Sequence, residues 1–283
     1  MVRGFFGRSK AKAAEQPGAA PDTGTQQGER RPAQRITEWP WDGQPDSAAC
    51  NFAVGHLFNN LPARLAVEGG IHAETCLAAI GAIAGYAAQR ALFARLKDTR
   101  DEALLKQMHT VKTKAGREYF FGEPLNRMLV PSSEAESNQR LWSLAAGSAV
   151  GAGLAPEQLP KIDDMFAHVA KSLGGEREGL PSVSKEHHPH MPVGGLLKGV
   201  WPLALMCFTG NVPKAKRKFG VAGMRHWPAI SARVASALMR KMPPTLDQRT
   251  ALIIVMESAI YASKLKPIML DEAGAKAVGA TLH

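Results

Sequence analysis

The stretch His72–Leu96, HAETCLAAIGAIAGYAAQRALFARL, decides the fold. It contains no proline, and from Leu77 to Ala88 apolar residues occupy every face of a helix, which predicts a central helix that other helices surround. Gly81 and Gly85 are four residues apart and would let a neighbouring backbone approach closely. Because the uncharged part is shorter than the roughly 20 residues that cross a bilayer, we expect a helical bundle and no transmembrane span.

Outside this helix, the apolar spacing predicts further helices and one hairpin. The expected helices lie near 46–62, 98–109, 131–151, 156–174, 194–208, 228–242 and 245–264. Residues 110–113 and 117–121 flank a turn with Gly116, which is typical of a β-hairpin. Abundant alanine and few aromatic residues favour helices. The sequence therefore predicts a mainly all-α protein, a multi-helix globular domain with one small β-hairpin.

Two regions are expected along the chain. Residues 1–45 are rich in proline, glycine and glutamine, and seven basic but only three acidic residues occur through Arg35. Such a composition predicts a disordered basic tail. Trp39 and Trp41 lie at its end and are expected to mark where the chain docks. Residues 46–283 are expected to form a single α-helical domain.

The cysteines indicate the compartment. Cys50, Cys76 and Cys207 are far apart and odd in number, and no CxxC pair occurs. A disulfide framework is therefore not expected, which favours a reducing compartment. No apolar stretch of a secretory signal follows the basic start of the sequence. We expect a cytoplasmic protein.

Histidines form one candidate metal site. His187, His188 and His190 fall within four residues of a long loop, and imidazole nitrogens are ligands that zinc and other divalent metals prefer. His72, at the start of the central helix, is a further candidate ligand if the loop folds over that helix end. The alternative is a polar surface loop whose histidines bond to backbone carbonyls, because no known zinc motif such as HExxH is present.

Basic residues are concentrated in one stretch. His187–Leu246 holds nine Lys or Arg and no Asp or Glu, in a chain whose net charge is +10. The residues expected to bind an anionic partner are Lys214, Lys216, Arg217, Lys218 and Arg225. Three interpretations stay open: binding of nucleic-acid phosphates, docking on an anionic lipid surface with Trp201, Phe208 and Phe219 as apolar anchors, or contact with an acidic protein surface.

These observations favour a binding protein over an enzyme. No GxxxxGK[ST], GxGxxG or GxSxG motif occurs, so no nucleotide or hydrolase site is indicated. We expect a non-enzymatic binding, assembly or regulatory protein that engages an anionic partner through its basic surface. The alternatives are a metal-dependent enzyme or metalloprotein that uses the His187–His190 loop, and a peripheral membrane-surface protein.

Overall fold

The computed structural model describes residues 39–68, 70–132, 139–212 and 219–266. These residues form nine α-helices, three short 3-10 turns and one antiparallel hairpin, which confirms the predicted class. The α-helices are α1 Ser47–Leu65, α2 Ala73–Thr99, α3 Glu102–Lys106, α4 Glu123–Leu129, α5 Leu141–Gly151, α6 Ile162–Ser172, α7 Val193–Thr209, α8 Trp227–Met239 and α9 Gln248–Lys264. The 3-10 turns are η1 Pro156–Gln158, η2 Lys185–His187 and η3 Met224–His226, and the strands are β1 Met108–Lys112 and β2 Glu118–Gly122.

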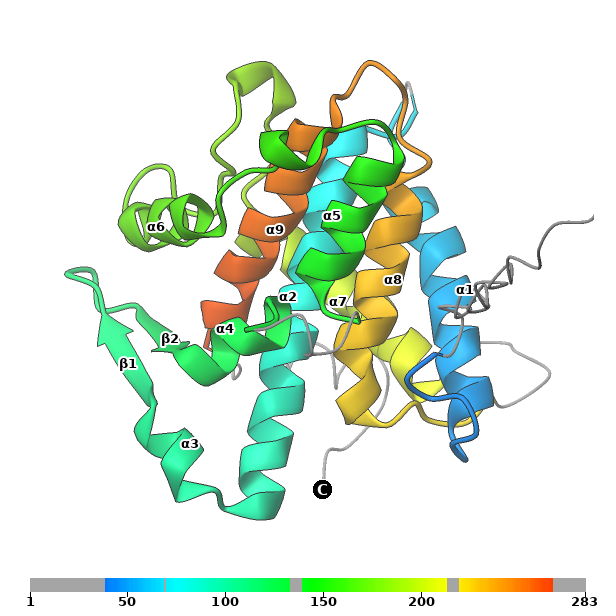
Figure 1. Ribbon diagram of the computed structural model, residues 1–283, viewed down its shortest axis with the longest axis vertical. Coiled ribbons are helices and arrows are strands. Elements are labelled where there is room, and N and C mark those ends of the chain that lie inside the picture. Colours follow the sequence, from blue (N-terminus) through cyan, green and yellow to red (C-terminus); the bar gives the residue numbers. More distant parts are fainter. Residues whose placement is uncertain (1–38, 69, 133–138, 213–218, 267–283) are drawn as a thin grey trace, which may run out of the picture. The chain divides into compact units, whose positions relative to one another are not determined.

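Helix α2 is the centre of the bundle, as predicted. Every residue from Glu74 to Gln89 is buried, and α1, α7, α8 and α9 pack around it (Figure 1). By length and composition alone, α2 would be long and apolar enough to cross a membrane. However, 89% of its most apolar window is buried by the rest of the chain. That burial is what a central core helix shows.

The closest approach to α2 is made by α9, and two glycines permit it. A Cβ atom added to Gly81 would overlap the carbonyl oxygen of Val255, and one added to Gly85 would overlap that of Ala259. Helix α2 also holds the last turn of α9 through Gln89. The amide nitrogen of this side chain donates to the Ser263 carbonyl at 2.5 Å and also to the carbonyl of the residue after α9.

The predicted hairpin is present beside the bundle. Strands β1 and β2 pair with Met108 opposite Gly122, and Gly116 in the turn has φ +80°. A backbone bridge joins Tyr119 to Leu265, just after α9. Because two strands alone are marginally stable, these contacts with the helices hold the hairpin in place.

The two tryptophans before α1 dock onto the domain. Trp41 is fully buried, and its indole nitrogen donates to Asn51 Oδ1 at 2.8 Å. The guanidinium of Arg233 lies 4.1 Å from the ring centroid of Trp39. The predicted docking point is therefore confirmed.

Several predicted helix starts differ from the structure. α2 continues to Thr99, so the cap of α3 is Asp101, whose carboxylate accepts from the Leu104 amide. The start of α9 is capped by Asp247, which accepts from the Thr250 amide at 2.9 Å. In each case the aspartate carboxylate accepts from one of the free amide groups of the first turn. Helix α4 was not predicted, and the helix predicted near 131–151 begins at Leu141, after residues 133–138, which lie outside the described residues.

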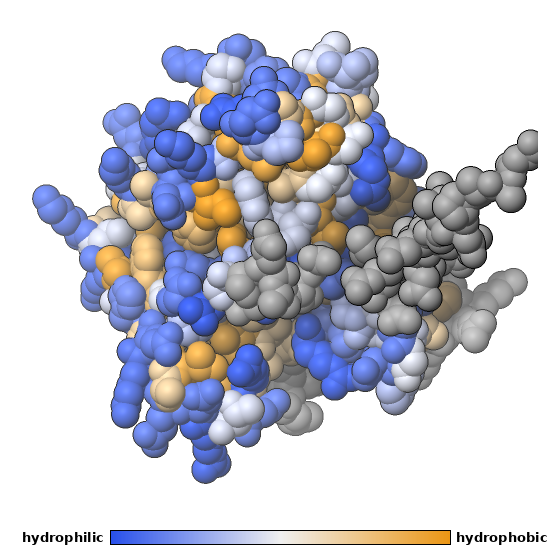
Figure 2. Space-filling model, viewed as in Figure 1, coloured by the Kyte–Doolittle hydropathy of each residue, from blue (hydrophilic) through white to orange (hydrophobic). Residues whose placement is uncertain are grey.

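The visible face of the molecule is mainly hydrophilic, with apolar side chains showing between the charged ones (Figure 2). Large exposed apolar side chains among the described residues belong to Val67, Ile71, Leu105, Val111, Val150, Met191 and Val221. They come from many different elements. Apolar residues scattered in this way are normal on a folded protein.

Candidate metal centre

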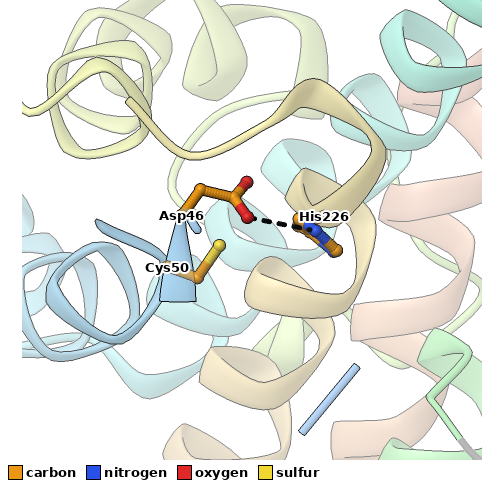
Figure 3. A group of neighbouring side chains, drawn as sticks. All are labelled: Asp46, Cys50 and His226. Carbon is orange, nitrogen blue, oxygen red and sulfur yellow. Dashed lines mark ion pairs between the residues drawn. The ribbon is translucent and has the colours of Figure 1, made fainter. Parts of the chain in front are cut away.

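Three potential metal ligands meet where α1 and α8 begin. Asp46, Cys50 and His226 each offer one ligand atom, and these atoms all lie within 4.8 Å of one another. Figure 3 shows the carboxylate of Asp46 directed toward the imidazole of His226, with the thiol of Cys50 beside them. Cys50 and His226 are buried, and Asp46 is half-buried. The described part of the chain therefore contains a group that could hold a metal ion.

Local structure brings these residues together. Asp46 is the residue before α1 and Cys50 lies four positions later, so both side chains are on one face of its first turn. The 3-10 turn η3 delivers His226 to the start of α8. The Gly223 amide donates to Asp46 Oδ2 at 2.7 Å and ties this turn to α1. The carboxylate is thus held by the turn and does not cap its own helix.

The second carboxylate oxygen has no such partner. Asp46 Oδ1 is buried and accepts no hydrogen bond from any described residue. Its nearest cationic or imidazole neighbours are His226 Nε2 at 3.7 Å and the guanidinium of Arg225 at 3.9 Å. Because a buried acceptor without a partner is costly, this oxygen is poised for a further ligand.

The surroundings set the protonation states of the three groups. Burial raises the pKa of Asp46, but the hydrogen bond from Gly223 and the nearby His226 and Arg225 outweigh it, so the pKa lies below its usual value. Burial, with help from Asp46, raises the pKa of the Cys50 thiol to about 12. Burial lowers the pKa of His226, although Asp46 opposes this effect. At neutral pH the site therefore holds a carboxylate, a thiol and a neutral imidazole.

Arg225, a residue predicted to bind an anionic partner, lies beside this site, and its predicted role stays a prediction. Its Nε donates to His226 Nε2 at 2.9 Å, and its terminal nitrogen donates to Gln44 Oε1 at 3.1 Å. The side chain is still 66% exposed. Arg225 therefore covers the candidate metal centre from the solvent side.

Three of the four predicted histidine ligands meet at the start of α2. His187 Nδ1 lies 2.8 Å from Glu74 Oε1, and His72 Nε2 lies 3.2 Å from Glu74 Oε2. The ring of His190 stacks on that of His72 with centroids 4.0 Å apart. His188 is not part of this group, because its Nε2 lies 3.2 Å from the Val183 carbonyl oxygen.

This histidine group is organised around a carboxylate. Burial raises the pKa of Glu74, but hydrogen bonding to His187 and the charge of His72 outweigh it, so the pKa is lowered. Burial lowers the pKa of His72. Among the described residues, these ring nitrogens do not form a group of three ligand atoms as close as that at Cys50. A metal ion on the His187–His190 loop stays a prediction.

The other predicted binding residues are placed as follows. Lys214, Lys216, Arg217 and Lys218 lie outside the described residues. The expected apolar anchors of a membrane surface are corrected in part: Trp201 and Phe208 are 1% and 0% exposed, because both face the core from α7. Phe219 stacks on Phe52 with ring centroids 3.7 Å apart.

The residues of the candidate metal centre were not found from the sequence. Asp46 and Cys50 have the four-residue spacing of a helix face, which is a weak signal without a third ligand. His226 lies far along the chain, and only the contact between α1 and α8 brings it close.

The fold and the site together define a mainly helical protein with a candidate metal centre. The chain matches no known protein family, no curated protein sequence and no solved structure.

Proposed function

We propose that the protein binds a divalent transition metal, zinc in the first place, through Asp46, Cys50 and His226. The observation that carries the proposal is the convergence of three ligand atoms within 4.8 Å, one of them on the half-buried carboxylate of Asp46, whose buried Oδ1 atom lacks a hydrogen bond. Thiolate, imidazole and carboxylate are the three side-chain ligands of zinc in proteins. The donor set therefore fits zinc better than magnesium or calcium, which prefer oxygen ligands alone.

The charge of the ligands supports this assignment. With Cys50 as thiolate and Asp46 ionised, the site carries two negative charges, which a divalent ion balances. Three protein ligands leave one position of a tetrahedral zinc ion for water or another group, as in catalytic zinc sites. An enzyme could use this open coordination position for catalysis, and a binding protein could use it for regulation by the metal. The non-enzymatic binding function predicted from the sequence could therefore also depend on the metal.

Loss of one ligand should weaken metal binding strongly. We expect Cys50→Ser to lower the affinity for zinc or cobalt by about 100-fold or more, since even outer-shell changes cost about 10- to 100-fold. The measurement is titration of the purified full chain with cobalt(II), whose thiolate bond gives a characteristic absorption. Cys207→Ser is the matched control, because Cys207 is equally buried and its pKa is also raised to about 12 by burial. Equal cobalt binding by wild type and Cys50→Ser would contradict the proposal.

Arg225 should compete with the metal. Because its Nε donates to the His226 nitrogen nearest to Asp46, a metal ion must displace this hydrogen bond, and the exposed side chain leaves room for the movement. We expect Arg225→Ala to tighten metal binding about tenfold, the value of one hydrogen bond to a charged group. Arg127→Ala is the control, since Arg127 is exposed and pairs with Glu123 within α4, which contributes no ligand to the candidate metal centre. Weaker binding by Arg225→Ala would show that the arginine supports the metal instead.

A second candidate function is binding of nucleic-acid phosphates through the basic stretch. It rests on the nine cations without an acidic residue between His187 and Leu246, of which Lys198, Arg225, Arg240 and Lys241 are exposed in the described part. We expect joint replacement of Lys214, Lys216, Arg217 and Lys218 by alanine to weaken oligonucleotide binding and flatten its salt dependence. Binding of the wild type and the variant to anionic lipid vesicles is measured in parallel, which separates nucleic-acid binding from docking on a lipid surface. Oligonucleotide binding that is unchanged in the variant would exclude this surface.

A further inference from the structure

A cavity lies between the hairpin, the start of α7 and the end of α9. Its volume is about 660 Å³, within the range of small-molecule sites, which is about 300–1,000 Å³. The side chains that matter for its chemistry are Arg117, Tyr119, Glu178, Lys198, Tyr261 and Lys266. None of the three candidate metal ligands lines it, so its function does not depend on the metal centre.

Glu178 organises the inner wall. Its Oε1 accepts from the hydroxyls of Tyr119 at 2.7 Å and Tyr261 at 2.8 Å, and its Oε2 accepts from Arg117 and the Gly174 amide, both at 2.9 Å. Burial raises the pKa of Glu178, but these hydrogen bonds outweigh it and the pKa is lowered. The carboxylate is therefore fully used by the protein, and it fixes both tyrosine rings as cavity walls.

The remaining charge in the cavity is positive. Arg117 is paired with Glu178, and Lys266 is paired with Glu118 at 2.6 Å. Lys198 lines the cavity from α7 and forms no ion pair with any residue that the structure describes. Three cations thus face two carboxylates, and the unmatched charge is that of Lys198.

The backbone on the same side of the cavity also favours an anion. Pro192, Gly194 and Gly195, at the start of α7, line the cavity, where the helix dipole is positive. The position of a Cβ on Gly194 would be 3.3 Å from the Tyr261 hydroxyl. The first turn of α7 and the tyrosine wall are therefore adjacent.

We propose that this cavity binds a small organic anion, with a phosphate or carboxylate group near Lys198 and an apolar body against Tyr119 and Tyr261. The aromatic rings and Leu265 provide the apolar surface, and polar groups at one side fix the orientation, which is the usual composition of a ligand site. Phosphate and carboxylate share the chemistry that Lys198 recognises.

The test uses phenyl phosphate, benzoate and the neutral benzyl alcohol as probes of the full chain. Binding is followed by the NMR shifts of the Gly194 and Gly195 amides. We expect at least one of the two anions to shift these amides in a saturable way, and the better anion identifies the acid group. Benzyl alcohol should bind at least about tenfold more weakly than that anion.

Lys198→Met should weaken the better anion about tenfold, and Lys161→Met should leave it unchanged, since Lys161 is exposed but does not line the cavity. Because Lys198 is exposed, its replacement leaves the core intact, which thermal unfolding checks. Absence of saturable shifts with both anions, equal binding of benzyl alcohol, or equal loss in the two lysine variants would overturn the proposal.

Discussion

Replacing Gly85 by alanine is expected to destabilise the protein by about 3 kcal/mol or more. The added Cβ would overlap the carbonyl oxygen of Ala259, and it would lie 2.6 Å from the carbonyl carbon of the same residue. Both atoms belong to the backbone of α9, so the clash can be relieved only by moving one helix away from the other. Urea unfolding followed by far-UV circular dichroism measures the change.

The sign of the change in stability distinguishes a clash between α2 and α9 from the effect of helix propensity. In an open helical position, glycine to alanine stabilises by up to about 1 kcal/mol. Gly147 in α5 and Gly199 in α7 have no neighbouring atom within 4 Å of an added Cβ, so Gly147→Ala and Gly199→Ala should gain stability. If Gly85→Ala also gained stability, α2 and α9 would not meet as described.

Replacing Lys264 by methionine should raise the free energy of unfolding at pH 7 by about 1 to 3 kcal/mol. Lys264 is 2% exposed and forms no ion pair with any described residue, although its ammonium lies 4.2 Å from the ring centroid of Phe121. Burial lowers its pKa from 10.5 to about 8, a gap worth about 3 kcal/mol. Attraction to the aromatic ring offsets part of this cost, and methionine fills a similar volume without a charge.

The same lysine predicts a pH dependence with a definite sign. Between pH 8 and 10.5 the unfolded chain binds more protons at Lys264 than the folded chain, so the stability of the wild type should rise with pH in this window. The full cost is present below pH 8. The difference between wild type and Lys264→Met should therefore shrink from about pH 8 upward, as measured by urea unfolding.

Lys97→Met is the control, because Lys97 also lies in the last turn of its helix but is exposed. This replacement should lower the free energy of unfolding at pH 7 by only a few tenths of a kcal/mol. Measurements should stop near pH 9.5, since burial raises the pKa of Tyr119 to about 12 and also raises that of Tyr261, which gives the opposite slope above pH 10. A constant difference between wild type and Lys264→Met would contradict the prediction.

The fold could be predicted where the sequence pattern is local. The apolar circumference of Leu77–Ala88 and the spacing of Gly81 and Gly85 correctly indicate a buried helix with a close neighbour. The turn at Gly116 correctly indicates the hairpin. Neither pattern says which helix is the neighbour, because α9 is defined only by its own apolar residues.

The candidate metal centre depends on contacts that no local pattern contains. The loop histidines were predicted as ligands because they are close in sequence. In the structure, however, His187 contacts Glu74, and His188 contacts the Val183 carbonyl oxygen. His226 looks unremarkable in sequence beside the basic Arg225, and it becomes a candidate ligand only because η3 places it against Asp46. Convergence in space, and not density along the chain, identifies these candidate ligands.

The pairing of α2 with α9 also governs when the protein can fold during synthesis. The central helix is made early, but its principal partner ends at Lys264, and the Gln89 side chain bonds to the Ser263 carbonyl. Until α9 has been synthesised, the face of α2 that α9 covers lacks its principal partner. Contacts between such distant segments form slowly, and apolar surface exposed in the meantime favours aggregation.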